Sequence, residues 1–112
     1  ILLPAYLCKT VLEPLRKLNI EPVYYDIDSE DLNPSYESFV TLAEKYDIKA
    51  VLVPSLYGNP ADLVSFEQYC KENNIFMIDD AAQSFGAKLD GRYVGTFGDA
   101  GFFSFSPGKP TA

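Results

Sequence analysis

Side chains that could do chemistry follow directly on several apolar runs of this sequence. They are two carboxylates, an amide, a hydroxyl and an amine: Asp79, Asp80, Gln83, Ser104 and Lys109. Ligands of open α/β sheets bind beyond the carboxyl ends of the strands, so residues in such positions are the first candidates for a functional site. Taken one at a time they have simpler interpretations, because two carboxylates can cap the next helix and a lysine after a turn is usually solvated.

In combination these groups match the needs of pyridoxal 5′-phosphate (PLP). Its aldehyde requires a lysine, its pyridinium nitrogen requires an acid, and its phosphate requires hydroxyl and backbone donors. Two carboxylates at the end of a buried strand also need a compensating cation, which would be either a metal ion or the protonated ring nitrogen. The chain has no histidine and its two cysteines, Cys8 and Cys70, are far apart, so zinc is not expected and no metal ligands are predicted.

Alternating strands and helices must position these groups. Apolar runs predict strands at 1–4, 22–27, 50–55, 75–78 and 100–105. Helical spacing predicts helices at 6–18 (kinked or divided at Pro14), 34–46 and 60–73. Asn33 and Asn59, each followed by Pro, are expected to cap the second and third helices. Strands that are apolar on both faces and separated by helices predict an α/β fold, a mostly parallel sheet with helices on both faces.

The end of the chain is predicted to present the amine to the sheet edge. A short hairpin is predicted at 89–95. The last strand would place Ser104 and Ser106 on one side, because side chains alternate along a strand. The turn at Pro107-Gly108 would then bring Lys109 over the edge of the sheet.

Composition and charge argue against several classes of function. A chain of 112 residues, 47% of them apolar, suits one small globular unit. The net charge of −7 argues against nucleic-acid binding. There is no membrane-span pattern and no signal peptide, so we expect a cytoplasmic protein with free thiols, a disulfide being the alternative. Neither end of the chain has the character of a natural terminus, so we expect an internal piece of a longer protein.

From Leu56 to Lys109 the sequence resembles the DegT/DnrJ/EryC/StrS family of PLP-dependent sugar-nucleotide aminotransferases, which have the aspartate aminotransferase fold (fold type I). The motifs that carry the resemblance are LYGNPAD at 56–62, IDDAAQS at 78–84, GA at 86–87, GRYVG at 91–95, FGDAGFFSF at 97–105, and Lys109. Residues 1–28 resemble the family more loosely. The resemblance implies that 1–112 form part of the large PLP-binding domain, without its amino-terminal phosphate loop and without the carboxy-terminal small domain.

The resemblance implies a role for each candidate residue. Asp80 would pair with the pyridinium nitrogen, and Gln83 would touch the hydroxyl side of the ring. Ser104 would bind the phosphate, and Lys109 would form the Schiff base and move protons during catalysis. Lys109 and Asp80 are thus the predicted catalytic residues. Asp79, at a position that is commonly Glu in the family, is not assigned to the cofactor.

The implied activity is transfer of an amino group, from a donor such as glutamate, to a nucleotide-linked keto sugar by a homodimer. Cys8 stands where the family often places an aromatic residue over the ring, so stacking would be weaker or come from Tyr6. This favours, as an alternative, a diverged relative that binds PLP without turnover or serves as a structural or regulatory domain. A simple phosphate-binding module would leave Asp80 and Lys109 unexplained. Relatives with His in place of the lysine are dehydratases, and Lys109 argues against that branch.

Overall fold

A five-stranded parallel sheet forms the centre of the protein. The computed structural model describes residues 1–7 and 9–104. The strands are β1 (Leu2–Pro4), β2 (Val23–Tyr25), β3 (Ala50–Pro54), β4 (Phe76–Asp80) and β7 (Ala100–Phe102). Their order is β2-β1-β3-β4-β7, and every neighbouring pair is parallel. The predicted α/β fold with a mostly parallel sheet is confirmed.

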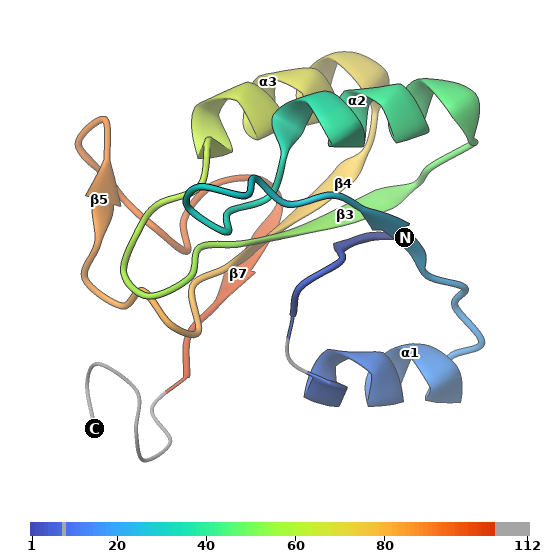
Figure 1. The fold of residues 1–112 in the computed structure, drawn as a ribbon, viewed down its shortest axis with the longest axis horizontal. Helices are drawn as coiled ribbons and strands as arrows, with labels where there is room; N and C mark the ends of the chain where they lie inside the picture. The colour runs from blue at the N-terminus through green and yellow to red at the C-terminus, as the bar shows by residue number, and fades with distance from the viewer. Residues whose placement is uncertain (8, 105–112) are drawn as a thin grey trace.

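Helices cover both faces of this sheet, as predicted (Figure 1). α2 (Tyr36–Lys45) and α3 (Leu63–Asn73) lie side by side on one face, whereas the 3-10 turn η1 (Lys9–Val11) and α1 (Leu12–Lys17) lie on the other. The core lies beneath α2 and α3, where the rings of Phe39 and Phe66 stack with centroids 4.8 Å apart. α1 buries no residue completely, and Phe76 and Phe102 on its side remain 49% and 41% exposed.

The two longer helices begin later than predicted. Ser35, rather than Asn33, caps α2, and its hydroxyl accepts a hydrogen bond from the backbone three residues on. Asp62, rather than Asn59, caps α3 in the same way. The Nδ2 of Asn33 instead donates to the carbonyl of Asn59 at 3.2 Å. The two Asn-Pro steps therefore belong to the connections that precede the helices, and the predicted asparagine caps were wrong.

The predictions for the first helix and the last strand need correction, whereas the prediction of a hairpin is confirmed. The first helical segment covers 9–17, and Pro14 does not divide it, because Pro14 lies in the first turn of α1, where its missing N–H is not needed. The hairpin is confirmed: β5 (Lys88–Leu89) and β6 (Arg92–Tyr93) are antiparallel and joined by Asp90-Gly91, both with positive φ. The last strand ends at Phe102, so Ser104 follows the strand rather than lying within it. Ser106 lies outside the described residues.

Candidate functional site

The polar residues predicted to hold a cofactor gather at the carboxyl edge of the sheet. Asp80 is the last residue of β4, Gln83 lies in the turn that follows, and Ser104 lies two residues beyond β7. The strands β4 and β7 are neighbours, with Asp80 paired to Phe102. All three predicted residues thus reach the same edge. Cys8, like Lys109, lies outside the described residues.

The adjacent carboxylates Asp79 and Asp80 face opposite sides of the sheet, because side chains alternate along a strand. Asp80 shares its face with Ile78, on the side of α1, and is half-buried. Its Oδ1 accepts a hydrogen bond from the backbone of Ala82 at 3.0 Å. Asp79 shares its face with Met77, on the side of α3, and is fully buried. Neither carboxylate caps a helix, since residues 81–84 form a turn, and this overturns the simplest interpretation of the pair.

The carboxylate of Asp79 stabilises the fold by accepting hydrogen bonds from the backbone. Its Oδ2 accepts hydrogen bonds from the backbone nitrogens of Gly95, at 2.6 Å, and Phe97, at 3.0 Å. Its Oδ1 is buried without a hydrogen-bond partner among the described residues. Burial raises the pKa of Asp79, against the opposing effect of the two backbone hydrogen bonds. Residues 95–97 lead into β7, and Ser104 follows that strand. The two hydrogen bonds to Asp79 therefore hold the segment that positions Ser104 at the edge of the sheet.

Two glycines allow this segment to pack closely. A Cβ on Gly101 would collide with the carbonyl oxygen of Gly95. A Cβ on Gly95, whose φ is +101°, would lie 2.5 Å from the ring of Phe103. The ring of Phe103 also meets that of Phe85 edge to face, with centroids 5.5 Å apart. The backbone just before Ser104 is therefore packed against the turn that follows β4.

Two buried serines join the turn after β3 to the turn after β4. Ser84 Oγ donates to the carbonyl of Ser55 at 2.6 Å and accepts from the nitrogen of Gly58 at 3.2 Å. The same nitrogen of Gly58 donates to the carbonyl of Gln83 at 3.1 Å. These bonds fix the backbone of Gln83 at the site. The roles of the serines were not predicted, although Ser55 ends the predicted strand at 50–55 and Ser84 belongs to the IDDAAQS motif.

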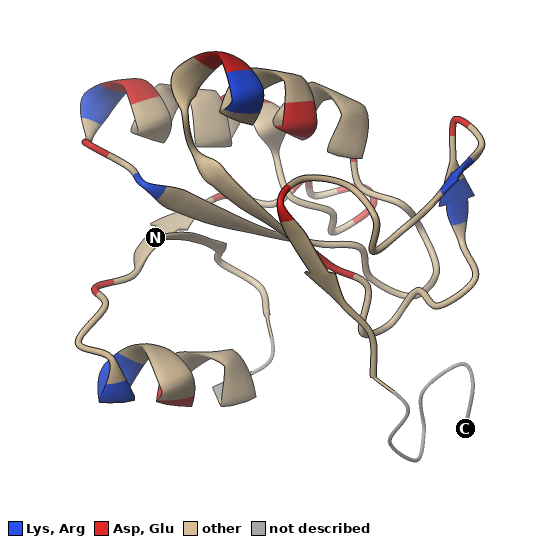
Figure 2. Cartoon of the chain, turned by 180° about the vertical axis from the view of Figure 1, so that it is seen from behind, with Lys and Arg blue, Asp and Glu red and all other residues tan. Residues whose placement is uncertain are grey.

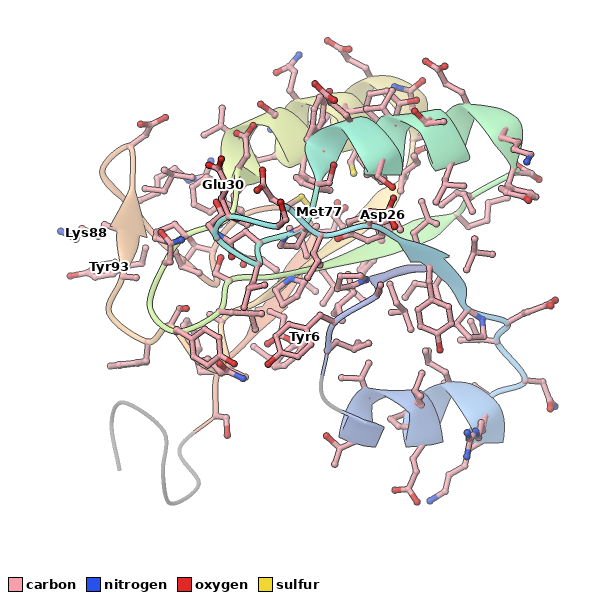
Figure 3. All side chains as sticks on the ribbon, viewed as in Figure 1. Tyr6, Asp26, Glu30, Met77, Lys88 and Tyr93 are labelled. Carbon is pink, nitrogen blue, oxygen red and sulfur yellow. The ribbon has the colours of Figure 1, made fainter. Side chains whose placement is uncertain are left out.

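A pair of tyrosines lies at the same edge. Tyr6 (Figure 3) follows β1, and Tyr57 follows β3. Their hydroxyl oxygens are 2.9 Å apart. The side chains are 44% and 67% exposed. The hydrogen bond to Tyr6 raises the pKa of Tyr57. From the sequence, Tyr6 was considered only as a substitute for ring stacking, and Tyr57 only as part of a motif.

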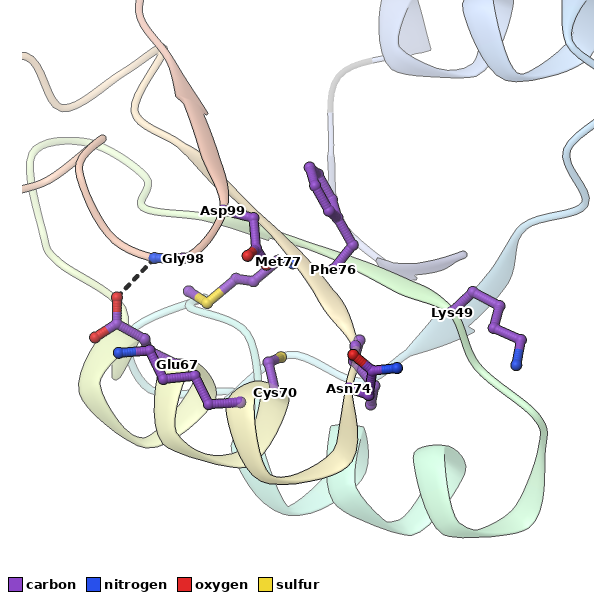
Figure 4. A pocket seen from close by; sticks show the side chains of 10 residues that line it. Lys49, Glu67, Cys70, Asn74, Phe76, Met77, Gly98 and Asp99 are labelled. Carbon is purple, nitrogen blue, oxygen red and sulfur yellow. Dashed lines mark hydrogen bonds between the residues drawn. The ribbon is translucent and has the colours of Figure 1, made fainter.

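A cavity at the amino end of β4 lies at the opposite edge of the sheet (Figure 4). Its carboxylate Glu67 is engaged in internal contacts: Glu67 Oε2 accepts from the backbone of Gly98 at 2.7 Å, and Arg92 donates to both oxygens of Glu67. The hydrogen bond from Arg92 lowers the pKa of Glu67, whereas burial raises the pKa of the free thiol of Cys70 to about 12. These interactions stabilise the fold and are separate from the predicted site.

Figure 2 shows lysine and arginine residues on α1, on the helices of the opposite face and on the hairpin rather than in one cluster. Within residues 1–7 and 9–104, no helix has the length and apolar character needed to cross a bilayer. The same residues contain no group of three or more acidic, histidine or cysteine side chains arranged to hold a metal ion.

The fold and the polar edge define a class of protein, the α/β domain of aminotransferases. A solved DegT DnrJ EryC1 StrS aminotransferase from Brucella abortus superimposes with a TM-score of 0.86 at 29% identity, over 97% of this chain and 31% of that one. The model of the DegT/DnrJ/EryC1/StrS aminotransferase family matches residues 1–112, and the chain belongs to this family. The predicted family and fold type are confirmed.

Two further relatives indicate the chemistry of the family. GDP-perosamine synthase of Escherichia coli O157:H7 is 39% identical over 88 residues, covering 79% of this chain and 24% of the relative. The E. coli GDP-4-keto-6-deoxy-D-mannose-3-dehydratase, solved with bound hydrated PLP, has a TM-score of 0.79 and 30% identity, over 91% of this chain and 26% of that one. The chain spans about a quarter of the length of the curated relatives it matches.

Proposed function

We propose that the whole protein is a PLP-dependent aminotransferase that moves an amino group from glutamate to a nucleotide-linked keto sugar. The observation that carries this proposal is the placement of Asp80. Its carboxylate ends a central strand on the face opposite Asp79, with Gln83 and Ser104 on the same edge. The names of the relatives, which include sugar-nucleotide aminotransferases, support the substrate class.

The donor set at the edge fits PLP. Asp80 would bind the ring nitrogen and keep its proton in place, Gln83 would contact the ring on its hydroxyl side, and Ser104 would bind the phosphate. When bound, PLP supplies an electron sink for the carbanion formed at the substrate carbon. Lys109 would bind the cofactor covalently, and its Nζ would carry protons to and from the reacting carbons. Cys8 would lie over the ring.

Residues 1–112 would then be the central part of the large domain of a longer chain. The amino-terminal phosphate loop and the small domain would come from the rest of that chain, and a homodimer in the cytoplasm would be the working form. The coverage of about a quarter of each relative supports this proposal.

Absorption spectroscopy of the whole protein with PLP tests the function. We expect a visible absorption band in the wild type that disappears in Lys109→Ala. Lys88→Ala, which removes an exposed lysine of the hairpin, serves as the control and should retain the band. Identical spectra for wild type and Lys109→Ala would refute the assignment of Lys109.

A second candidate, a PLP-binding protein without turnover, is favoured by Cys8 at the stacking position. Adding glutamate distinguishes the two. With an aminotransferase, glutamate should abolish the visible band of the PLP-loaded protein, whereas with a non-catalytic relative the band should stay unchanged.

A further inference from the structure

The Tyr6 and Tyr57 hydroxyl pair has features that packing alone does not explain. Both side chains are substantially exposed, so neither is needed to fill the core. They come from loops more than fifty residues apart in sequence, yet their hydroxyls meet at 2.9 Å. Because the bond uses one of the two hydroxyl protons, the pair can still donate the other proton to a ligand.

The backbone at Tyr57 is held in an unfavourable conformation. Its φ of 54° lies in the left-handed region, which a bulky side chain rarely adopts. Glycine is the residue suited to such a position, and Gly58 follows immediately. Backbone strain of this kind at an exposed aromatic residue beside a polar edge is typical of functional sites. The conformation presents the ring at the edge instead of packing it into the fold.

The turn that carries Tyr57 is tied to the candidate site. The nitrogen of Gly58 donates to the carbonyl of Gln83 and to Ser84 Oγ. Any displacement of Tyr57 would therefore act on the turn that carries Gln83. Tyr57 is thus joined through backbone hydrogen bonds to the turn that carries Gln83.

The strand order separates the tyrosines from the proposed phosphate contact. Tyr6 and Tyr57 follow β1 and β3, whereas Ser104 follows β7, and Asp80 at the end of β4 lies between them. A ligand group that contacts the tyrosines is therefore a different group from the one that contacts Ser104. The site extends from β7 across β4 to β3 and β1.

We propose that Tyr6 and Tyr57 form a subsite for the sugar ring of the amino acceptor, an inference that rests on the proposed function. Exposed phenol rings combine an apolar face, which packs on the C–H surface of a pyranose, with a polar tip that bonds a hydroxyl or oxo group. A sugar ring has both features. The tyrosines are specificity-determining residues in this proposal, and they take no part in proton transfer.

Separate half-reactions of the whole protein test the subsite. The first half-reaction uses glutamate and involves no sugar, and the second uses GDP-4-keto-6-deoxy-D-mannose, the substrate named for one relative. We expect Tyr57→Phe and Tyr6→Phe to leave the glutamate half-reaction unchanged. They should raise KM for the sugar about fivefold to tenfold, the loss of one hydrogen bond. The double variant should resemble the single variants, because both break the same pair.

Tyr57→Gly separates binding from stability. Glycine relieves the left-handed strain, so we expect a Tm equal to or above that of the wild type, together with a larger rise in sugar KM. A purely structural tyrosine would give the reverse, a lower Tm with unchanged KM. Tyr46→Phe, at an exposed tyrosine beyond the other end of the sheet, is the matched control and should change neither quantity.

The outcomes distinguish this inference from the proposed function. No PLP band in the wild type would overturn the proposed function itself. A normal band with both half-reactions impaired equally by Tyr57→Phe would show that the pair serves the cofactor and would overturn the subsite. Unchanged sugar KM in all the tyrosine variants would do the same. Calorimetric titration with GDP-mannose, which cannot be turned over, gives a binding readout independent of activity.

Discussion

The Asp79 Oδ2 atom lies 2.6 Å from the backbone nitrogen of Gly95, and this contact anchors the segment that enters β7. A second hydrogen bond, from Phe97 at 3.0 Å, reaches the same oxygen. The buried carboxylate of Asp79 thus stabilises the backbone, whereas that of Asp80 lies on the opposite face of the sheet, at the candidate site. The different roles of Asp79 and Asp80 predict different effects of substitutions on stability and on activity.

Asp79→Ala should destabilise the whole protein by about 3 kcal/mol, because two backbone N–H groups lose their acceptor. Asp79→Asn retains an acceptor oxygen and is the matched control. Denaturant unfolding measures both. A loss in Asp79→Ala no larger than in Asp79→Asn would contradict the role of the two hydrogen bonds.

The raised pKa of Asp79 predicts a pH dependence of stability. A carboxyl whose pKa is higher in the folded than in the unfolded state contributes stability below its ordinary value of 3.8, and this contribution is lost as the pH rises through the folded value. The free energy of unfolding of Asp79→Asn should therefore fall less than that of the wild type as the pH rises above 3.8. Parallel curves for the two proteins would contradict this prediction.

Glu67 should act in the opposite direction. Its pKa is lowered by the hydrogen bond from Arg92, so its contribution is present above the ordinary value of 4.5 and is lost as the pH falls through the folded value. Glu67→Gln should flatten the acid side of the stability curve, as measured by denaturation across the acid range. If the stability of Glu67→Gln fell with decreasing pH as steeply as that of the wild type, the Glu67–Arg92 pair would be excluded as a cause of the acid sensitivity.

Gly101→Ala should cost about 2 kcal/mol or more, because the added Cβ collides with the carbonyl of Gly95 and β7 must shift. Gly86→Ala is the control: unlike Gly101, Gly86 has a positive φ, of +87°, but the space around it is open, so only the backbone penalty of about 1 kcal/mol is expected. Thermal unfolding of the two variants compares them directly. We expect only Gly101→Ala to weaken PLP binding as well, through the displacement of Ser104.

Asp80→Asn should leave the fold intact and lower kcat about a hundredfold or more, because an amide does not keep the ring nitrogen protonated. Asp47→Asn, at an exposed aspartate of the opposite edge, is the control. Steady-state kinetics and unfolding curves of the whole protein measure the two effects. A stability loss in Asp80→Asn comparable to that in Asp79→Ala would place Asp80 among the structural residues instead.

The sequence determined the fold class and most of the residues at the edge. Continuous apolar runs at 50–55 and 75–78 required a sheet buried on both faces, and the alternation with helices required it to be parallel. In such a sheet Asp80, Gln83 and the segment containing Ser104 must follow the strands at one edge. Periodicity and turn chemistry are local properties, and they can be read from the chain.

Contacts between distant segments were decided by the tertiary structure alone. Asp79 and Asp80 lie on opposite faces of the sheet because side chains alternate along a strand. The hydrogen bond from Gly95 to Asp79, however, forms only because the loop before β7 folds back on β4. Ser35 and Asp62 cap the helices in place of the predicted asparagines, because side-chain hydrogen bonds, rather than residue preference, decide where a helix begins. The meeting of the Tyr6 and Tyr57 hydroxyls depends on the neighbouring positions of β1 and β3 in the sheet, which no local pattern encodes.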